Sequence, residues 1–177
     1  SELFRGSVAG RTPRRLCSPH AAGGNVLELA LGADQTRVVY RADSRANDVF
    51  ELFVAPADGS SAPLRLGPDL AVGADVRSFE LTPDLTRVVF RADALVRGRV
   101  ELFSAALDGS GFVRLNQDLA SHADVLDFAL TSDSAAVVYR ANVDSVANQE
   151  LFLAPTDGSL GARNDVKCAS IEHKLGI

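Results

Sequence analysis

The chain has 177 residues, of which 46% are hydrophobic, and its net charge is −5. This composition fits a packed domain, and no apolar run approaches the ~20 residues of a membrane-spanning helix, so we expect no membrane insertion. The acidic balance argues against a nucleic-acid groove, and two cysteines are too few for a zinc site or a disulfide scaffold.

An internal repeat of about 50 residues organises the chain. The triplet Glu-Leu-Phe begins at residues 2, 51, 101 and 150, and Asp-Gly-Ser begins at residues 58, 108 and 157. Arg-Ala-Asp at residues 41 and 91 returns as Arg-Ala-Asn at residue 140. Several independent markers in one register indicate a single structural unit used in series.

The chain opens within a unit, because Glu2-Leu3-Phe4 matches the third segment of the later copies. The copy at residues 75–115 shows the whole unit. Apolar or β-branched runs predict four strands, and Thr82-Pro83-Asp84 and Asp108-Gly109 predict tight turns. The predicted strands are Val76–Leu81, Arg87–Phe90, Val100–Ala105 and Phe112–Leu115.

Four short strands joined by tight turns form an antiparallel meander with apolar side chains on both faces. Such a sheet must stack on copies of itself, as the blades of a β-propeller do. An irregular β-sandwich is the alternative. We therefore predict an all-β fold of propeller-type blades, forming an incomplete ring or one completed by oligomerisation. The expected segments are a half blade in residues 1–17, blades in 25–66, 75–115 and 124–159, and an atypical C-terminal tail in 160–177.

These motifs resemble the TolB-like β-propeller repeat, closely over residues 25–159 and in part over residues 2–16. The resemblance is carried by Phe79-Glu80-Leu81-Thr82-Pro83-Asp84, Arg87-Val88-Val89-Phe90, Glu101-Leu102-Phe103 and Leu107-Asp108-Gly109-Ser110-Gly111. It implies a protein-binding module located in the periplasm, at the cell surface or outside the cell. One departure is that the glycine usual at the end of the first turn is Gln35, Leu85 or Ser134, which predicts a plainer type I turn.

About three and a half blades are too few to close a ring alone. A ring of two chains, excision from a longer polypeptide and an open polymerising stack all predict that the isolated chain is not a simple monomer. We expect a non-catalytic interaction scaffold that binds itself and another protein. The alternatives are a self-assembling structural subunit and an accessory propeller fragment of a larger secreted protein or peptidase.

The loops between second and third strands should share one rim with the connections between blades. This rim is either a binding surface or a solvated acidic edge. Its candidate residues are Asp43, Asp48, Asp69, Asp93, Arg97, Arg99, Asp118, His122 and Asp144. Strand geometry also places Arg91 beside Asp75 and Arg140 beside Asp124, as structural ion pairs or as a repeated binding spot.

Catalytic and metal chemistry have little support in the sequence. No Gly-x-Ser-x-Gly element is present, the calcium-loop spacing is missing, and the three histidines lack partners at ligand spacing. We therefore expect no enzyme activity, cofactor or metal. Cys17 and Cys168 would meet in a disulfide only if an arc closed or two chains joined. Residues 165–177 would form either a short helix over a blade face or a frayed tail.

Overall fold

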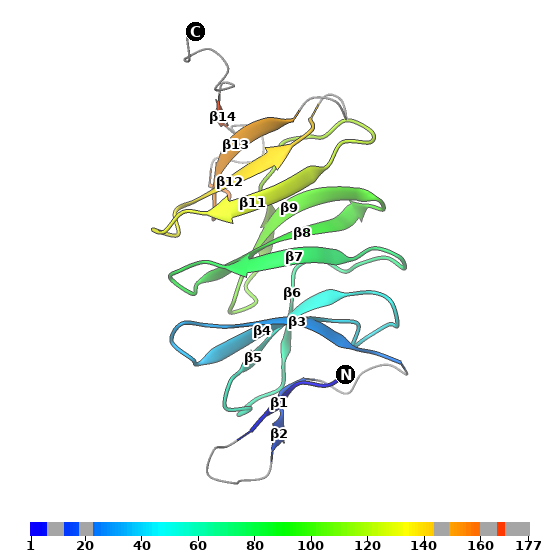
Figure 1. The fold of residues 1–177 in the computed structure, drawn as a ribbon, viewed down its shortest axis with the longest axis vertical. Helices are drawn as coiled ribbons and strands as arrows, with labels where there is room; N and C mark the ends of the chain where they lie inside the picture. The colour runs from blue at the N-terminus through cyan, green and yellow to red at the C-terminus, as the bar shows by residue number, and fades with distance from the viewer. Residues whose placement is uncertain (7–12, 18–22, 144–148, 160–165, 169–177) are drawn as a thin grey trace, which may run out of the picture.

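The computed structural model describes residues 1–6, 13–17, 23–143, 149–159 and 166–168. For residues 166–168 it describes the backbone alone. The described residues form strands and turns only, gathered in four separate sheets. Figure 1 shows these sheets one above another, with β1–β2 at one end of the row and β11–β14 at the other. Among the described residues there is no helix of sufficient length and hydrophobicity to cross a membrane.

The half blade consists of β1 (Phe4–Arg5) and β2 (Arg14–Arg15), which pair antiparallel. Three four-stranded sheets follow along the chain and are called the first, second and third blade. The first blade contains β3 (Val26–Leu31), β4 (Arg37–Ala42), β5 (Glu51–Pro56) and β6 (Leu64–Leu66). The second contains β7 (Val76–Leu81), β8 (Arg87–Val96), β9 (Arg99–Ala106) and β10 (Phe112–Arg114). The third contains β11 (Val125–Leu130), β12 (Ala136–Ala141), β13 (Glu150–Pro155) and β14 (Val166–Cys168).

Each blade is an antiparallel meander in which strands adjacent in sequence are adjacent in the sheet. The fold class predicted from the repeat is confirmed. All three blades carry a register shift near the start of their first strand, between Val26 and Glu28 in the first blade and at matching positions in the other two. The repeat therefore extends to irregularities of the backbone.

The C-terminal tail contributes a strand. Val166–Cys168 form β14, which pairs with β13 and gives the third blade its fourth strand. These three residues are therefore not part of the helix considered for residues 165–177, and the rest of that stretch lies outside the described residues.

The first turn of each blade differs from the plainer turn expected without glycine. Gln35, Leu85 and Ser134 have φ angles of 57°, 57° and 64°, in the left-handed region that glycine would favour. The turn is held by its own hydrogen bonds. In the second blade the Leu85 N–H donates to the Thr82 carbonyl at 2.9 Å, and the Thr86 N–H donates to the Asp84 carboxylate at 3.1 Å. These hydrogen bonds hold the turn in a left-handed backbone conformation that is strained for any residue other than glycine.

The hydrophobic core lies between the sheets, and the Glu-Leu-Phe triplets of the first and second blades each contribute to two interfaces. Leu52 of the first blade shares a cluster with Phe103 of the second, and Leu102 of the second shares one with Phe152 of the third. Successive side chains of a strand point to opposite faces. The leucine therefore packs against the following blade and the phenylalanine against the preceding one.

The turn between third and fourth strands brings consecutive sheets into close contact. In the second blade this turn contains Gly109, whose φ is 78°. A Cβ atom on Gly109 would lie 2.4 Å from Leu64 Cδ2 of β6 in the first blade. Gly158 makes the same approach to Val113 of β10, so the contact recurs along the stack.

Candidate binding surfaces

Two aspartates of the predicted rim are internal parts of the fold. Asp43 and Asp93 are each only 1% exposed. The Asp93 carboxylate accepts the Asp75 N–H at 2.7 Å and the Gly98 N–H at 3.0 Å, and Asp43 accepts the corresponding Asn25 N–H. In the third blade Asn142 takes this place and accepts the Asp124 N–H at 2.6 Å. These side chains satisfy buried backbone donors and offer little to a ligand.

Asp75 and Asp124 connect neighbouring blades. Asp75 accepts the Phe50 N–H at 2.9 Å, just before β5, and Asp124 accepts the Val100 N–H at 2.7 Å, near the start of β9, so both reach the preceding blade. The N-terminal amino group of Ser1 donates to Asn25 Oδ1 at 2.7 Å in the same position of the repeat.

The ion pairs predicted for Arg91 with Asp75 and for Arg140 with Asp124 are replaced by other contacts. The register shift places Arg91 opposite Ser78 and Arg140 opposite Asp127. Arg91 Nε donates to Ser78 Oγ at 3.0 Å, and Arg140 Nη2 lies 2.5 Å from Asp127 Oδ2. The prediction took Arg91 and Asp75 as neighbouring strand ends, but Asp75 lies opposite Asp93, whose N–H donates to the Asp75 carbonyl at 3.3 Å.

Arginines at this position also reach the next blade where one follows. Arg41 Nη1 donates to the Val76 carbonyl at 2.7 Å, and Arg91 Nη1 donates to the Val125 carbonyl at 3.3 Å. Arg140 has no following blade in the described residues, and its exposed guanidinium pairs within its own sheet. The spot is therefore a joint between sheets rather than a repeated ligand site.

Part of the exposed rim consists of Arg–carboxylate clusters. Asp69 lies between Arg45, at 3.1 Å, and Arg65, at 2.9 Å, which confirms that the loop after the second strand meets the connection between blades. Asp118 pairs with Arg114 at 2.6 Å in the next blade. Exposed pairs of this kind contribute little stability and remain accessible to a partner.

The remaining rim candidates do not gather into one site. Asp48 and His122 are exposed and have positive φ angles, of 60° and 71°. Arg97 lies over Gly73, and Arg99 Nη2 approaches the buried Glu101 at 3.5 Å. Asp144 lies outside the described residues.

Sequence reasoning missed that the glutamate of the repeated triplet is buried in the first and second blades. Glu51 and Glu101 are buried, and each lies beside the arginine of its fourth strand, Arg65 at 3.5 Å or Arg114 at 3.1 Å. Burial raises the pKa of Glu51, and the charges of Arg45 and Arg65 oppose that rise. The strict recurrence of Glu before Leu-Phe, paired with a basic residue in the next strand, is the signal that would have found this pair.

The disulfide between Cys17 and Cys168 stays a prediction. Cys17 is a free, buried thiol whose Sγ accepts the Leu3 N–H at 3.3 Å, inside the half blade. Cys168 belongs to β14, at the opposite end of the row, and its side chain is outside the described part. His20 and His173 also lie outside the described ranges, and within them no three metal-binding side chains are grouped.

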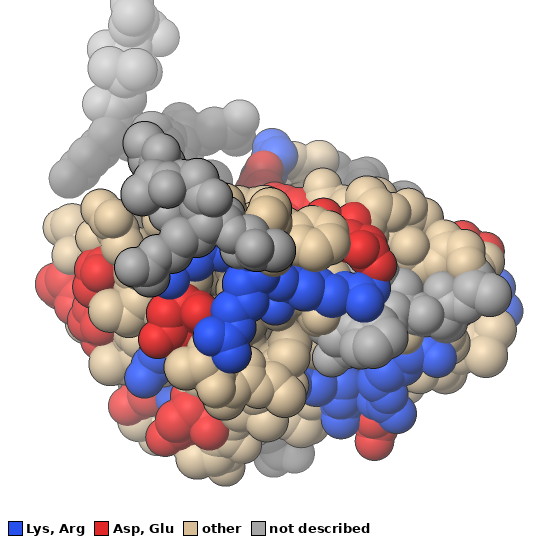
Figure 2. All heavy atoms as spheres, turned by 90° about the horizontal axis from the view of Figure 1, so that it is seen from below, with Lys and Arg blue, Asp and Glu red and all other residues tan. Residues whose placement is uncertain are grey.

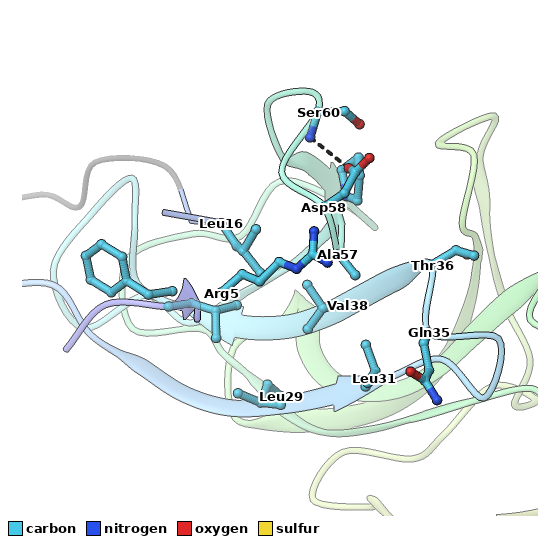
Figure 3. Close-up of a pocket in the computed structure, with 13 residues that line it drawn as sticks. Arg5, Leu16, Leu29, Leu31, Gln35, Thr36, Val38, Ala57, Asp58 and Ser60 are labelled. Carbon is cyan, nitrogen blue, oxygen red and sulfur yellow. Dashed lines mark hydrogen bonds between the residues drawn. The ribbon is translucent and has the colours of Figure 1, made fainter. Parts of the chain in front are cut away.

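An apolar slot lies between the half blade and the first blade. Its volume is about 630 Å³, and it is lined mainly by Leu3 and Leu16 on the half-blade side and by Leu29, Leu31 and Val38 on the other. Figure 3 shows the β3 leucines along one wall, with the Arg5 side chain extending between Val38 and Leu16. Leu29 and Leu31 are each 52% exposed, so the fold leaves an open apolar surface here.

The two ends of the row carry a second type of uncovered surface. Leu151 of the third blade is 40% exposed, whereas Leu52 and Leu102 at the same position of the repeat are fully buried. Phe4 of the half blade is 50% exposed, although Phe103 at its position is fully buried. The end that carries β1–β2 also has basic side chains over its middle (Figure 2).

Comparisons with known proteins add a resemblance of fold. No family model matches the sequence, and no match was found among the curated proteins. A solved structure from Agrobacterium tumefaciens that carries the provisional name TolB aligns with 94% of this chain and 73% of its own, at 13% identity and a TM-score of 0.42. The assignment of propeller-type blades depends on the sheets described above.

Proposed function

We propose that this chain is a non-catalytic scaffold that binds another polypeptide. The observation that carries the proposal is the apolar slot, where Leu29 and Leu31 stay exposed beside a rigid stack of sheets. A surface that is already formed loses little conformational entropy when a partner binds. An apolar patch with a polar surround is typical of a protein-interaction site.

The polar side chains favour a scaffold over an enzyme. The buried acids Asp93 and Asp43 hold backbone donors, and Glu51 and Glu101 lie beside arginines. We propose no reaction for them. A location outside the cytoplasm, and a place as an accessory domain in a larger secreted protein or peptidase, stay predictions.

The scaffold proposal is tested with cell extract from the native source. The immobilised chain is compared with a Leu29→Asp/Leu31→Asp variant and with Val72→Asp, a matched change at an exposed valine outside the slot. We expect one partner to be retained by the wild type and by Val72→Asp and lost by the double variant. Identical retention by all three proteins contradicts the proposal.

A second candidate function is self-assembly through the ends of the row. Leu151 and Phe4 are uncovered members of a contact that Leu52–Phe103 and Leu102–Phe152 make inside the chain. The ends also differ in charge, because residues 1–17 hold four Arg and one Glu, whereas residues 124–159 hold six acids and one Arg. A head-to-tail contact between copies would cover both surfaces and, if it does not close, would give a filament.

Light scattering over a range of protein concentrations tests self-assembly. We expect the mass to rise with concentration and to return toward 18.7 kDa in Leu151→Asp, with Val72→Asp behaving as the wild type. Salt should weaken an assembly that depends on opposite charges. A constant mass of 18.7 kDa for the wild type contradicts this candidate.

A further inference from the structure

We propose that the slot accepts a β-hairpin of a partner polypeptide, one with the pattern of this chain's own first and second blade strands. The inference rests on the proposed scaffold function and names the chemistry of its partner. The half blade differs from the three complete blades in ways that define such a hairpin.

The half blade corresponds to the third and fourth strands of a blade. Phe4 is opposite Arg15 in the same register in which Phe53 is opposite Arg65 and Phe103 is opposite Arg114. In the complete blades, β5, β9 and β13 each pair with a second strand at their other edge. Among the described residues β1 has β2 as its only strand partner, so its other edge is open to main-chain hydrogen bonds.

The wall of the slot shows what its occupant must cover. Phe79 occupies the position of Leu29 in the second blade, and there it is only 9% exposed. Its cluster includes Ala30 and Val39, which belong to the first and second strands of the preceding blade. No counterpart of these two strands stands beside β1 among the described residues. A small or β-branched side chain on each incoming strand would bury Leu29 and Leu31 in the same way.

The outer face of the half blade specifies a further feature of the hairpin. In each complete blade an aromatic residue of the second strand stacks on the phenylalanine of the third, with ring centroids 5.2–5.5 Å apart. Phe4 occupies the third-strand position and is half exposed. The partner's second strand would therefore carry valine toward the slot, followed by an aromatic residue that stacks on Phe4.

Repeat identity, the open edge and the two apolar surfaces point to the same occupant. Main-chain bonds to β1 would give affinity, and alternate side chains on the two faces would give specificity. An isolated hairpin is marginally stable in water, so the partner would become ordered as it binds.

The test uses the full chain and a fluorescein-labelled synthetic peptide with the sequence of residues 75–93, which contains one such hairpin. We expect saturable 1:1 binding in fluorescence anisotropy. Affinity should fall at least tenfold for the Leu29→Asp/Leu31→Asp protein and for a peptide carrying Phe90→Ala, and it should be unchanged for Val72→Asp. Far-UV circular dichroism of each protein variant reports whether its sheets are retained.

Three results would overturn the proposal. The first is an unchanged anisotropy, and the second is equal binding by the slot variant and Val72→Asp. The third is a wild-type dimer that the slot variant converts to a monomer without any peptide binding, which would assign the slot to a second copy of the chain. If the peptide fails while the extract partner is still lost with Leu29→Asp/Leu31→Asp, the hairpin is excluded and the scaffold function stands.

Discussion

Strands β3 and β7 occupy the same place in the repeat and have opposite exposures. Leu29 of β3 lies half open to solvent, whereas Phe79 of β7 is nearly buried. The residues are alike in hydrophobicity, and the difference comes from the sheet on the preceding side, which has four strands for β7 and two for β3. Burial in the described part of the chain is thus set by the neighbouring blade, and the end surfaces are the ones that no described sheet covers.

We expect the largest difference in stability between substitutions of Phe103, in the middle of the row, and of Phe4, at its end. Phe103→Ala should lower the free energy of unfolding by about 3–5 kcal/mol, because it opens a cavity between two sheets. Phe4→Ala should cost less than about 1 kcal/mol, because half of that side chain is already in water. Urea unfolding measures both.

Phe103→Leu provides a folded reference if Phe103→Ala does not fold. Equal losses for Phe4→Ala and Phe103→Ala would show that the end of the row is covered in solution.

A second comparison concerns Arg91, which bonds to the next blade, and Arg140, which pairs within its own sheet. Arg91→Ala should cost about 1–2 kcal/mol, since it removes charged hydrogen bonds to Ser78 and to the Val125 carbonyl of the next blade. Arg140→Ala should cost no more than about 0.5 kcal/mol, because it removes an exposed pair with Asp127. Thermal unfolding separates the two, and a larger loss for Arg140→Ala would contradict this account.

Asp93→Asn compares the second blade with the third, where Asn142 stands naturally. Burial raises the pKa of Asp93, but the N–H groups of Asp75 and Gly98 and the charge of Arg77 outweigh burial and hold it below the ordinary value. A carboxyl group whose pKa is lowered in the folded state stabilises that state above its unfolded pKa of about 3.9, and this contribution is lost as the pH falls.

Asp93→Asn should therefore cost about 1 kcal/mol at pH 7, and the difference from wild type should shrink below about pH 4. Guanidinium unfolding at several pH values measures the effect. A difference that grows as the pH falls would contradict the assigned direction of the shift.

The smallest predicted effect concerns backbone strain in the first turns. Gln35→Gly should raise the stability by about 0.5–1 kcal/mol, because Gln35 is exposed and has a φ of 57°. Leu85→Gly should gain less, since the Leu85 side chain contacts the first blade near Gly32. Differential scanning calorimetry gives both values, and a loss of stability in Gln35→Gly would contradict a strained turn.

Much of the fold could be predicted from the sequence because the repeat supplies three copies of the same local signals and part of a fourth. Three strands of the second blade lie within one residue of their expected bounds, and turns such as Asp108-Gly109 fall where expected. The second strand was expected to end at Phe90 but continues to Val96. The fourth strand at Val166–Cys168 was missed because its sequence departs from the Arg-Leu of the earlier copies.

The candidate site was predicted less well, because it depends on side-chain geometry that spacing does not determine. Asp75 lies opposite Asp93, and a bulge places Arg91 opposite Ser78, so the expected ion pair does not form. Acids expected on a solvated rim accept backbone hydrogen bonds instead, as Asp93 shows. The slot depends on which strands the half blade lacks. The alternation of Leu27, Leu29 and Leu31 was visible, but its exposure follows only from the arrangement of two sheets.

The close approach of Gly109 to Leu64 has a consequence for the geometry of the whole array. A larger residue at this turn would wedge the two sheets apart along one edge only. The absence of a side chain there therefore helps to set the dihedral tilt from one sheet to the next. That tilt, added once per repeat, governs the curvature of the stack and so how many blades a full circle would need.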